Sequence, residues 1–109
     1  MADTSSGQNR RFAEMYIAPK PAAHTCPMST MPLDAGRAPE GSPLRTEFAA
    51  GLERLAHIVA GDELSQERLT LLAATVGAAI LGAAGGATPV AAQIADAVIR
   101  YADELDNRT

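Results

Sequence analysis

The sequence predicts an all-α domain of four to five helices. Apolar side chains recur at intervals of three and four residues along three long segments, as on the buried face of a helix. Each segment follows a serine or threonine that can cap a helix, and in two of them a proline comes next. No stretch shows the apolar–polar alternation of a strand. We expect a helical domain at residues 10–106 after a disordered tail at residues 1–9.

Two short helices are expected in the first 40 residues. The first covers residues 8–18, with Phe12, Met15 and Tyr16 on one face, and the prolines at positions 19 and 21 end it. Residues 27–37 combine two prolines and a glycine, which break regular structure, with three apolar side chains that favour burial. We expect a short, kinked helix there.

The third predicted helix begins after Ser42 and ends at Gly61. Ser42 can accept a hydrogen bond from the first turn, and Pro43 is tolerated next because an N–H at that position has no partner within the helix. The apolar stripe of this helix consists of Leu44, Phe48, Leu52, Leu55 and Val59.

The last two helices are expected to follow Ser65 and Thr88, with Gly85-Gly86 as the stop between them. Both segments carry apolar residues on two faces, and such a helix has to be covered on two sides. We therefore expect one side to face the chain's own core and the other to face a second copy in a homodimer. The abundance of alanine, which buries little area per residue, also favours association.

Composition and charge exclude some classes of protein. Apolar residues make up 47% of the 109 residues, which argues against a disordered chain. The net charge is −4, and residues 61–109 carry seven acidic groups against three basic ones, so this half repels a phosphate backbone. We expect no direct nucleic-acid binding by this chain alone. A single cysteine, Cys26, and the lack of a secretory signal at the N-terminus fit a reducing, cytoplasmic location.

A membrane protein is the alternative. Residues 69–95 form a run of 27 residues without a charged side chain, which exceeds the length of about 20 residues that crosses a bilayer. However, Gly85-Gly86 and Thr88-Pro89 interrupt the run, and alanine and glycine contribute little insertion energy. A helical hairpin buried in a dimer explains the same residues, and we prefer it to a membrane hairpin at residues 69–95.

No group of residues predicts catalysis or metal binding. His24, Cys26 and Asp34 are near one another in sequence but lack the spacing of a metal site. His57 lies near the end of the third helix, where an imidazolium interacts favourably with the helix dipole. The chain has neither a nucleophile elbow nor a phosphate-binding glycine loop. We expect a protein that is not an enzyme and uses neither a metal nor a cofactor.

The methionines suggest a small-molecule site. Methionine adapts to ligands of different shapes, and an apolar pocket with a few polar groups is the usual form of such a site. The same methionines could instead fill the core, so the sequence leaves both interpretations open. The expected ligand-binding residues are Met15, Tyr16, Cys26, Met28, Met31, Phe48 and Leu52.

Three motifs follow one another along the first part of the chain. They are Tyr16-Ile17-Ala18-Pro19, Thr25-Cys26-Pro27-Met28 and Phe48-Ala49-Ala50-Gly51-Leu52-Glu53-Arg54-Leu55. Their order and spacing resemble the C-terminal domain of a TetR-type transcriptional repressor. The later runs LLAATVGAAILGAAGG and ATPVAAQIADAVIRYADEL resemble the final helix pair of the same family.

The resemblance implies an effector-binding and dimerisation domain. The last two helices of each subunit would pack into a four-helix interface. A small apolar ligand would enter beside the short helix and shift the spacing of attached DNA-binding heads. Only nine residues precede Arg10, so we expect the helix-turn-helix head of the family to be missing from this chain. The expected dimer-interface residues are Leu72, Val76, Ile80, Ile94, Val98 and Ile99.

Overall fold

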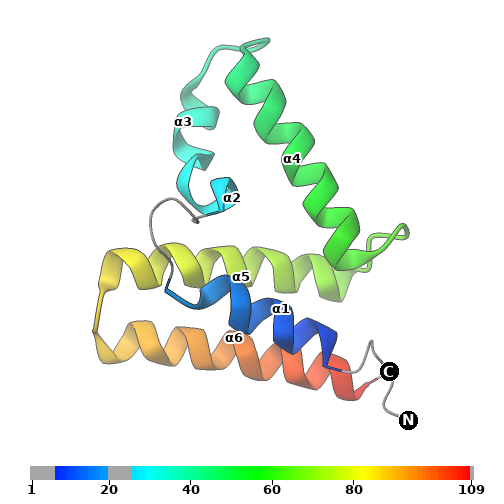
Figure 1. The fold of residues 1–109 in the computed structure, drawn as a ribbon, viewed down its shortest axis with the longest axis vertical. Coiled ribbons are helices and arrows are strands. Elements are labelled where there is room, and N and C mark those ends of the chain that lie inside the picture. Colours follow the sequence, from blue (N-terminus) through cyan, green and yellow to red (C-terminus); the bar gives the residue numbers. More distant parts are fainter. Residues whose placement is uncertain (1–6, 20–25, 109) are drawn as a thin grey trace.

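The computed structural model describes residues 7–19 and 26–108, and this part of the chain is all-helical (Figure 1). The all-α prediction is confirmed. The described residues form six helices, not four to five, because the kinked helix expected at residues 27–37 is divided in two. The helices are α1 (Gln8–Ile17), α2 (Pro27–Thr30), α3 (Pro32–Arg37), α4 (Pro43–Ala60), α5 (Gln66–Gly85) and α6 (Pro89–Asn107).

The boundaries of the three long helices lie where the caps predict them. The side-chain oxygens of Ser42, Ser65 and Thr88 each accept a hydrogen bond from the backbone N–H three residues later, at 3.3–3.4 Å. At the other ends, Gly61 follows α4 with φ 78° and Gly86 follows α5 with φ 62°. Glycine adopts this left-handed backbone without the steric cost that a Cβ would add, which explains where both helices stop.

The break between α2 and α3 has a local cause. Pro32 has no N–H to donate to a carbonyl one turn earlier, so a single helix cannot continue through it. Met31 lies at the break, where its N–H donates to the carbonyl of Pro27 at 3.0 Å. Each short helix still buries one side chain, Met28 from α2 and Ala35 from α3.

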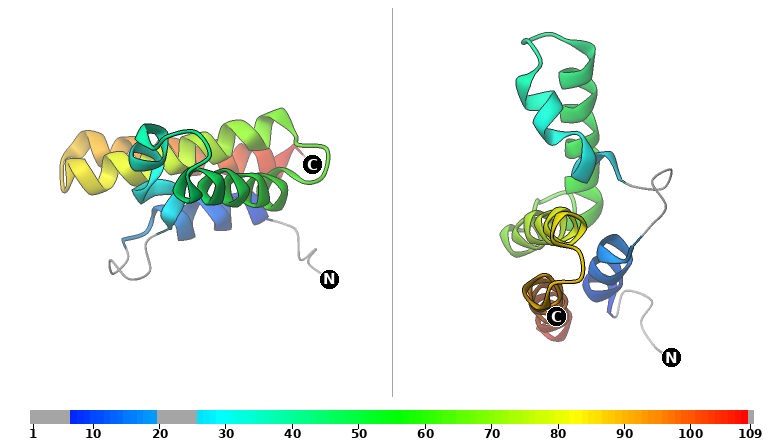
Figure 2. Two further views of the ribbon diagram at one scale, coloured as in Figure 1. Left: turned by 90° about the horizontal axis from the view of Figure 1, so that it is seen from above. Right: turned by 90° about the vertical axis from the view of Figure 1, so that its left-hand side faces the viewer.

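The core lies between α1, α5 and α6. The last two helices run antiparallel as a hairpin, and α1 packs across one face of it (Figures 1 and 2). Thr75 of α5 is fully buried, and its hydroxyl has no hydrogen-bond partner among the described residues. The buried apolar cluster consists of Ala13, Leu71, Ala78, Val98, Ala102 and Leu105.

The other three helices form an arch over one edge of this layer. From its junction with the start of α5, α4 rises away from the hairpin (Figure 1). Both α2 and α3 pack against α4, and α2 also packs against α5. Among the 18 residues of α4, only Ala60 is buried. Among the described residues, the arch therefore has no apolar core of comparable size.

A carboxylate joins the N-terminal end of α1 to the C-terminal end of α6. The position before α1 is Gly7, which has no side chain to cap the helix. Instead, the two carboxylate oxygens of Asp106 accept hydrogen bonds from the backbone N–H groups of Asn9 and Arg10, both at 3.0 Å. Gln8 and Asn9 are the first two residues of α1, which begins where the first helix was expected. Residues 1–6 of the expected tail lie outside the described part.

Candidate functional site

The first candidate site is a groove between α2 and α4, which we call the methionine groove. Its volume is about 630 Å³. It is mainly apolar, with two charged side chains, Glu47 and Arg54, about two turns apart on α4. The groove is lined by Cys26, Pro27, Met28, Met31, Leu44, Glu47, Phe48, Ala50, Gly51, Arg54, Leu55 and Ile58.

Two residues show how α2 and α4 meet at this groove. A Cβ on Gly51 would lie 3.2 Å from the Cε of Met28, so glycine allows the methionine tip to approach the backbone of α4. Met28 is buried, whereas Ile58, which also lines the groove, is 73% exposed. The groove thus combines a packed methionine with an apolar side chain in solvent. An apolar ligand that covered Ile58 would gain the hydrophobic free energy of that side chain.

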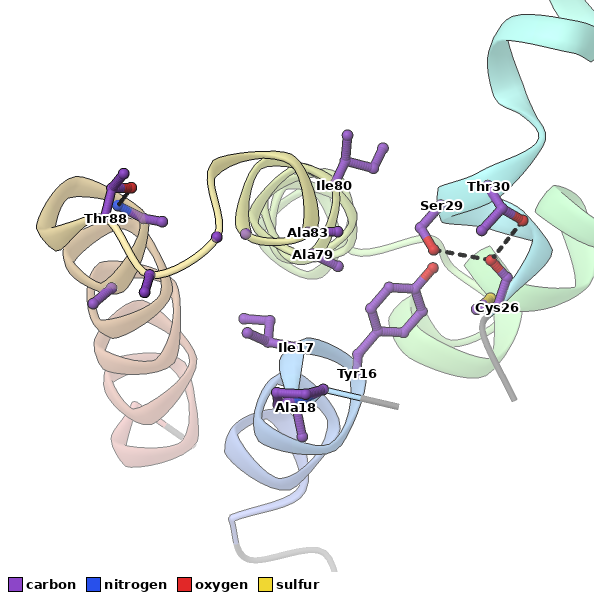
Figure 3. Close-up of a pocket in the computed structure, with 16 residues that line it drawn as sticks. Tyr16, Ile17, Ala18, Cys26, Ser29, Thr30, Ala79, Ile80, Ala83 and Thr88 are labelled. Carbon is purple, nitrogen blue, oxygen red and sulfur yellow. Dashed lines mark hydrogen bonds between the residues drawn. The ribbon is translucent and has the colours of Figure 1, made fainter. Parts of the chain in front are cut away.

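The second candidate site, which we call the tyrosine cavity, lies among α1, α2 and the tip of the α5–α6 hairpin (Figure 3). Its volume is about 700 Å³. Alanine and glycine predominate in the wall contributed by α5 and α6, which also includes Ile80, and hydroxyl and thiol groups lie on the side of α1 and α2. The cavity is lined by Tyr16, Ile17, Ala18, Pro19, Cys26, Ser29, Thr30, Ala79, Ile80, Gly82, Ala83, Gly86, Ala87, Thr88, Ala91 and Ala92.

The polar side of the tyrosine cavity is an interacting cluster. The Ser29 and Thr30 hydroxyls both donate to the backbone carbonyl of Cys26, at 2.9 and 3.4 Å. The Tyr16 hydroxyl points toward Ser29 and Cys26 (Figure 3). Burial raises the pKa of Tyr16 above its ordinary value, the interaction with Cys26 raises it further, and the Ser29 hydroxyl offsets part of this rise. Tyr16 is therefore a neutral phenol at physiological pH.

Five of the seven expected ligand-binding residues line these two sites. Tyr16 lines the tyrosine cavity, Met28, Met31 and Phe48 line the methionine groove, and Cys26 lines both. The other two line neither site: Met15 is 69% exposed and Leu52 is 45% exposed. Met15 directly precedes Tyr16, and Leu52 directly follows Gly51, so each is next to a lining residue. Successive side chains on a helix point about 100° apart, which explains why these two do not face the sites.

The alanine wall of the tyrosine cavity was not expected from the sequence. Ala79, Ala83 and Ala91 carry no chemistry of their own, so they resemble ordinary helix-packing residues. The one pattern that includes them is the uncharged run at residues 69–95. Their contribution is the space that a methyl group leaves where a larger side chain would fill the cavity.

The expected dimer residues fall into two groups. Leu72 is 5% exposed and Val98 is 8% exposed, so both are buried within the chain itself and neither offers a surface to a partner. Val76, Ile94 and Ile99 are half-buried, and Ile80 is 37% exposed. The sequence correctly indicated that α5 and α6 are apolar on more than one side, but it did not separate the inner side from the outer side.

A different set of residues forms the face of the hairpin that α1 does not cover, which we call the outer face. In Figures 1 and 2, α1 lies on one side of α5 and α6, and no described helix lies on the other. A Cβ added to Gly77 in the middle of this face would meet no atom within 4 Å. The hydroxyl of Tyr101 in α6 donates to the carbonyl of Glu67 in α5 at 3.4 Å, so this side chain lies beside α5. By helical spacing, the outer face consists of Thr70, Ala73, Gly77, Ile80 and Ala84 from α5 and Val90, Ile94, Ala97 and Tyr101 from α6. Of these, Ile80 also lines the tyrosine cavity, and Ile94 and Tyr101 are half-buried against the core.

Two features of the described residues bear on the alternative functions. By length and composition, α5 is the one described helix that could cross a membrane, and 22% of its most apolar 18-residue window is buried inside the chain. Among the same residues, no group of three or more His, Cys, Asp or Glu side chains is arranged to hold a metal ion. His24 lies outside the described residues.

Comparisons with known proteins give no assignment. No protein-family model, no curated protein and no solved structure matches this chain.

Proposed function

We propose that this chain is the effector-binding and dimerisation domain of a TetR-type transcriptional regulator and acts in the cytoplasm as a homodimer. The observation that carries the dimer is the uncovered outer face of the α5–α6 hairpin. The observation that supports effector binding is the methionine groove beside the short helix α2. Both are consistent with the motif order along the chain, from Tyr16 to the final helix pair.

The outer face has the size and chemistry of a helix–helix interface. Its members on each helix are spaced by three and four residues, as in the seam between packed helices, and none of them is charged. Two helices of this length present a face of about 30 by 20 Å, or on the order of 600 Å². A standard interface buries about 800 Å² per partner, so this face is large enough for most of one. Two hairpins packed by their outer faces form a four-helix bundle.

A charge placed on the outer face tests the dimer. Ala73 is exposed within one chain, so Ala73→Glu should leave the monomer folded and yet place two unpaired carboxylates in the interface. Ala49→Glu on the exposed side of α4 is the matched control. Sedimentation equilibrium should give twice the 11.3 kDa chain mass for the wild type and the control, and the single-chain mass for Ala73→Glu. A monomeric wild type at tens of micromolar would refute the dimer.

The effector site is the methionine groove, and its occupant is a small, mainly apolar molecule. Met28, Met31 and Phe48 offer polarisable and aromatic contacts, and Ile58 gains cover when the groove is filled. The groove lies between two helices of the weakly packed arch. A ligand with a higher affinity for one α2–α4 spacing would therefore shift the population toward that spacing.

The methionine methyl groups report this binding directly. With 1-decanol as the probe, we expect the NMR signals of the Met28 and Met31 methyl groups to shift. The methyl of Met15, which is exposed and lines neither site, serves as the internal control. Phe48→Ala should weaken binding because the aromatic wall is lost. Equal shifts at all three methyl groups, or none, would contradict a specific groove site.

A membrane hairpin is the second candidate, because α5 is uncharged from Leu69 to Gly85 and mostly unburied within the chain. The argument against it is that α6 carries Asp96, Arg100 and Glu104, so a two-helix hairpin would bring charges into the hydrocarbon. Flotation with phospholipid vesicles separates the two proposals. A protein that floats with the vesicles and needs detergent for extraction supports the membrane hairpin, whereas a lipid-free dimer supports the regulator.

A further inference from the structure

We propose that the tyrosine cavity is a second ligand site, distinct from the methionine groove, for a neutral amphipathic molecule such as an alkylphenol. Such a ligand has a compact hydrocarbon body and one hydroxyl group. This proposal goes beyond the effector site in the groove and does not depend on the TetR resemblance. It rests on the size of the cavity, the kind of groups on its walls and the absence of charge among the described residues that line it.

The size and position of the cavity fit a small molecule. Its volume of about 700 Å³ lies within the range of roughly 300–1,000 Å³ that is common for ligand sites. Its walls come from the C-terminal end of α1, from α2, and from the end of α5 and the start of α6 at the hairpin tip (Figure 3). The methyl groups of Ala79, Ala83 and Ala91 line the hairpin side, and these small side chains leave the space that a ligand body would fill.

Charge decides between a neutral and an ionic ligand. None of the described residues that line the tyrosine cavity is Asp, Glu, Lys, Arg or His. An ionic ligand would lose part of its hydration there without gaining an opposite charge, which is costly. The methionine groove differs, because Glu47 and Arg54 are among its lining residues. The tyrosine cavity therefore favours uncharged molecules more strongly than the groove does.

The hydroxyl cluster gives the ligand an orientation. The protons of Ser29 and Thr30 are directed to the carbonyl of Cys26, so the lone pairs of both hydroxyl oxygens retain acceptor capacity. Tyr16 adds a phenol that burial keeps protonated. A ligand hydroxyl on this side can donate to these oxygens while its hydrocarbon body lies against the alanine wall. The site thus selects a molecule with a polar group at one end.

Binding of 4-butylphenol tests the proposal, with isothermal titration calorimetry on the full chain as the measurement. Ala83→Phe fills the cavity from the hairpin side and should lower the affinity at least tenfold. Ala49→Phe, on the exposed side of α4 and lining neither site, should leave the affinity unchanged. Tyr16→Phe removes one hydroxyl and should weaken binding about two- to tenfold, the loss of one neutral hydrogen bond. Butylbenzene, which lacks the hydroxyl, should bind the wild type correspondingly more weakly.

The results that would overturn the proposal are separate from those that test the groove. No detectable binding of 4-butylphenol, or an affinity that Ala83→Phe does not change, would rule out the tyrosine cavity as its site. If 4-butylphenol shifts the Met28 and Met31 methyl signals as 1-decanol does, it binds in the groove. This result would also overturn the proposal for the tyrosine cavity. Each of these outcomes leaves the dimer and the groove site to be judged by their own experiments.

Discussion

Asp106 lies in the last turn of α6, where a negative charge interacts unfavourably with the C-terminal end of its own helix dipole. Its position is explained by α1, because its two carboxylate oxygens accept the backbone N–H groups of Asn9 and Arg10 at 3.0 Å. These N–H groups belong to the first turn of α1 and have no partner within that helix. Replacing Asp106 with alanine therefore removes a cap that another helix provides.

The size of the effect follows from these two hydrogen bonds. Loss of a side-chain cap costs about 1 kcal/mol, with an upper value near 2 kcal/mol. Here two bonds to a charged acceptor are lost, although one of them is exposed, so we expect about 2 kcal/mol for Asp106→Ala. In a domain of about 100 residues, this corresponds to a decrease in melting temperature on the order of 10 °C.

Urea unfolding followed by circular dichroism measures the change. Asp96→Ala is the matched control, because Asp96 is an exposed aspartate in the same helix and its replacement brings the same gain in helix propensity. We expect Asp106→Ala to be less stable than Asp96→Ala by about 2 kcal/mol. If the two variants unfold at the same urea concentration, Asp106 does not cap α1, and the two hydrogen bonds between the ends of α1 and α6 are wrong.

Four further substitutions test the core, a turn and the tyrosine cavity, each by urea unfolding. Leu71→Ala should cost about 3 kcal/mol, because Leu71 is fully buried in the core cluster, and a cost below about 1 kcal/mol would contradict that packing. Thr75→Val should stabilise the fold by about 1 kcal/mol, since its buried hydroxyl has no hydrogen-bond partner among the described residues; destabilisation would indicate one. Gly61→Ala should cost about 1 kcal/mol or more, because φ is 78° there, and a neutral effect would contradict this backbone. Folding raises the pKa of Tyr16, so its contribution to stability is complete below about pH 10 and is lost as the pH rises further. The Tyr16→Phe variant should lack that part of the alkaline decline, whereas Tyr101→Phe should retain it, and identical pH profiles for the two would argue against burial of Tyr16.

The helix boundaries could be predicted from sequence because their causes are local. A serine or threonine cap, a proline in the next position and a glycine with positive φ act within one turn of the chain, as at Ser42 and Gly61. The break at Pro32 was also local, although sequence suggested a bend and the structure has two helices. The cap at the start of α1 could not be predicted, because its donor groups and Asp106 are 96 and 97 residues apart.

The candidate sites were predictable only in part, for a related reason. Methionine, tyrosine and cysteine stand out in a sequence, so the residues that α1, α2 and α4 contribute were found. Whether a side chain faces a groove or the solvent depends on how the helix is rotated against its neighbours, and a rotation of about 100° separates Met15 from Tyr16. The alanine wall and the division of α5 into an inner and an outer side both depend on tertiary packing.

The inner and outer sides of α5 differ in the size of their side chains, and this bears on what covers the outer one. The inner side carries Leu71 and Leu72, which fill the space against neighbouring helices. The middle of the outer face carries Ala73 and Gly77. Such small residues add little free energy of transfer into lipid, but they let the backbone of another helix approach closely and so increase van der Waals contact. The same apolar run is thus better suited to a second copy of the hairpin than to a bilayer, which is why we favour the dimer over the membrane hairpin.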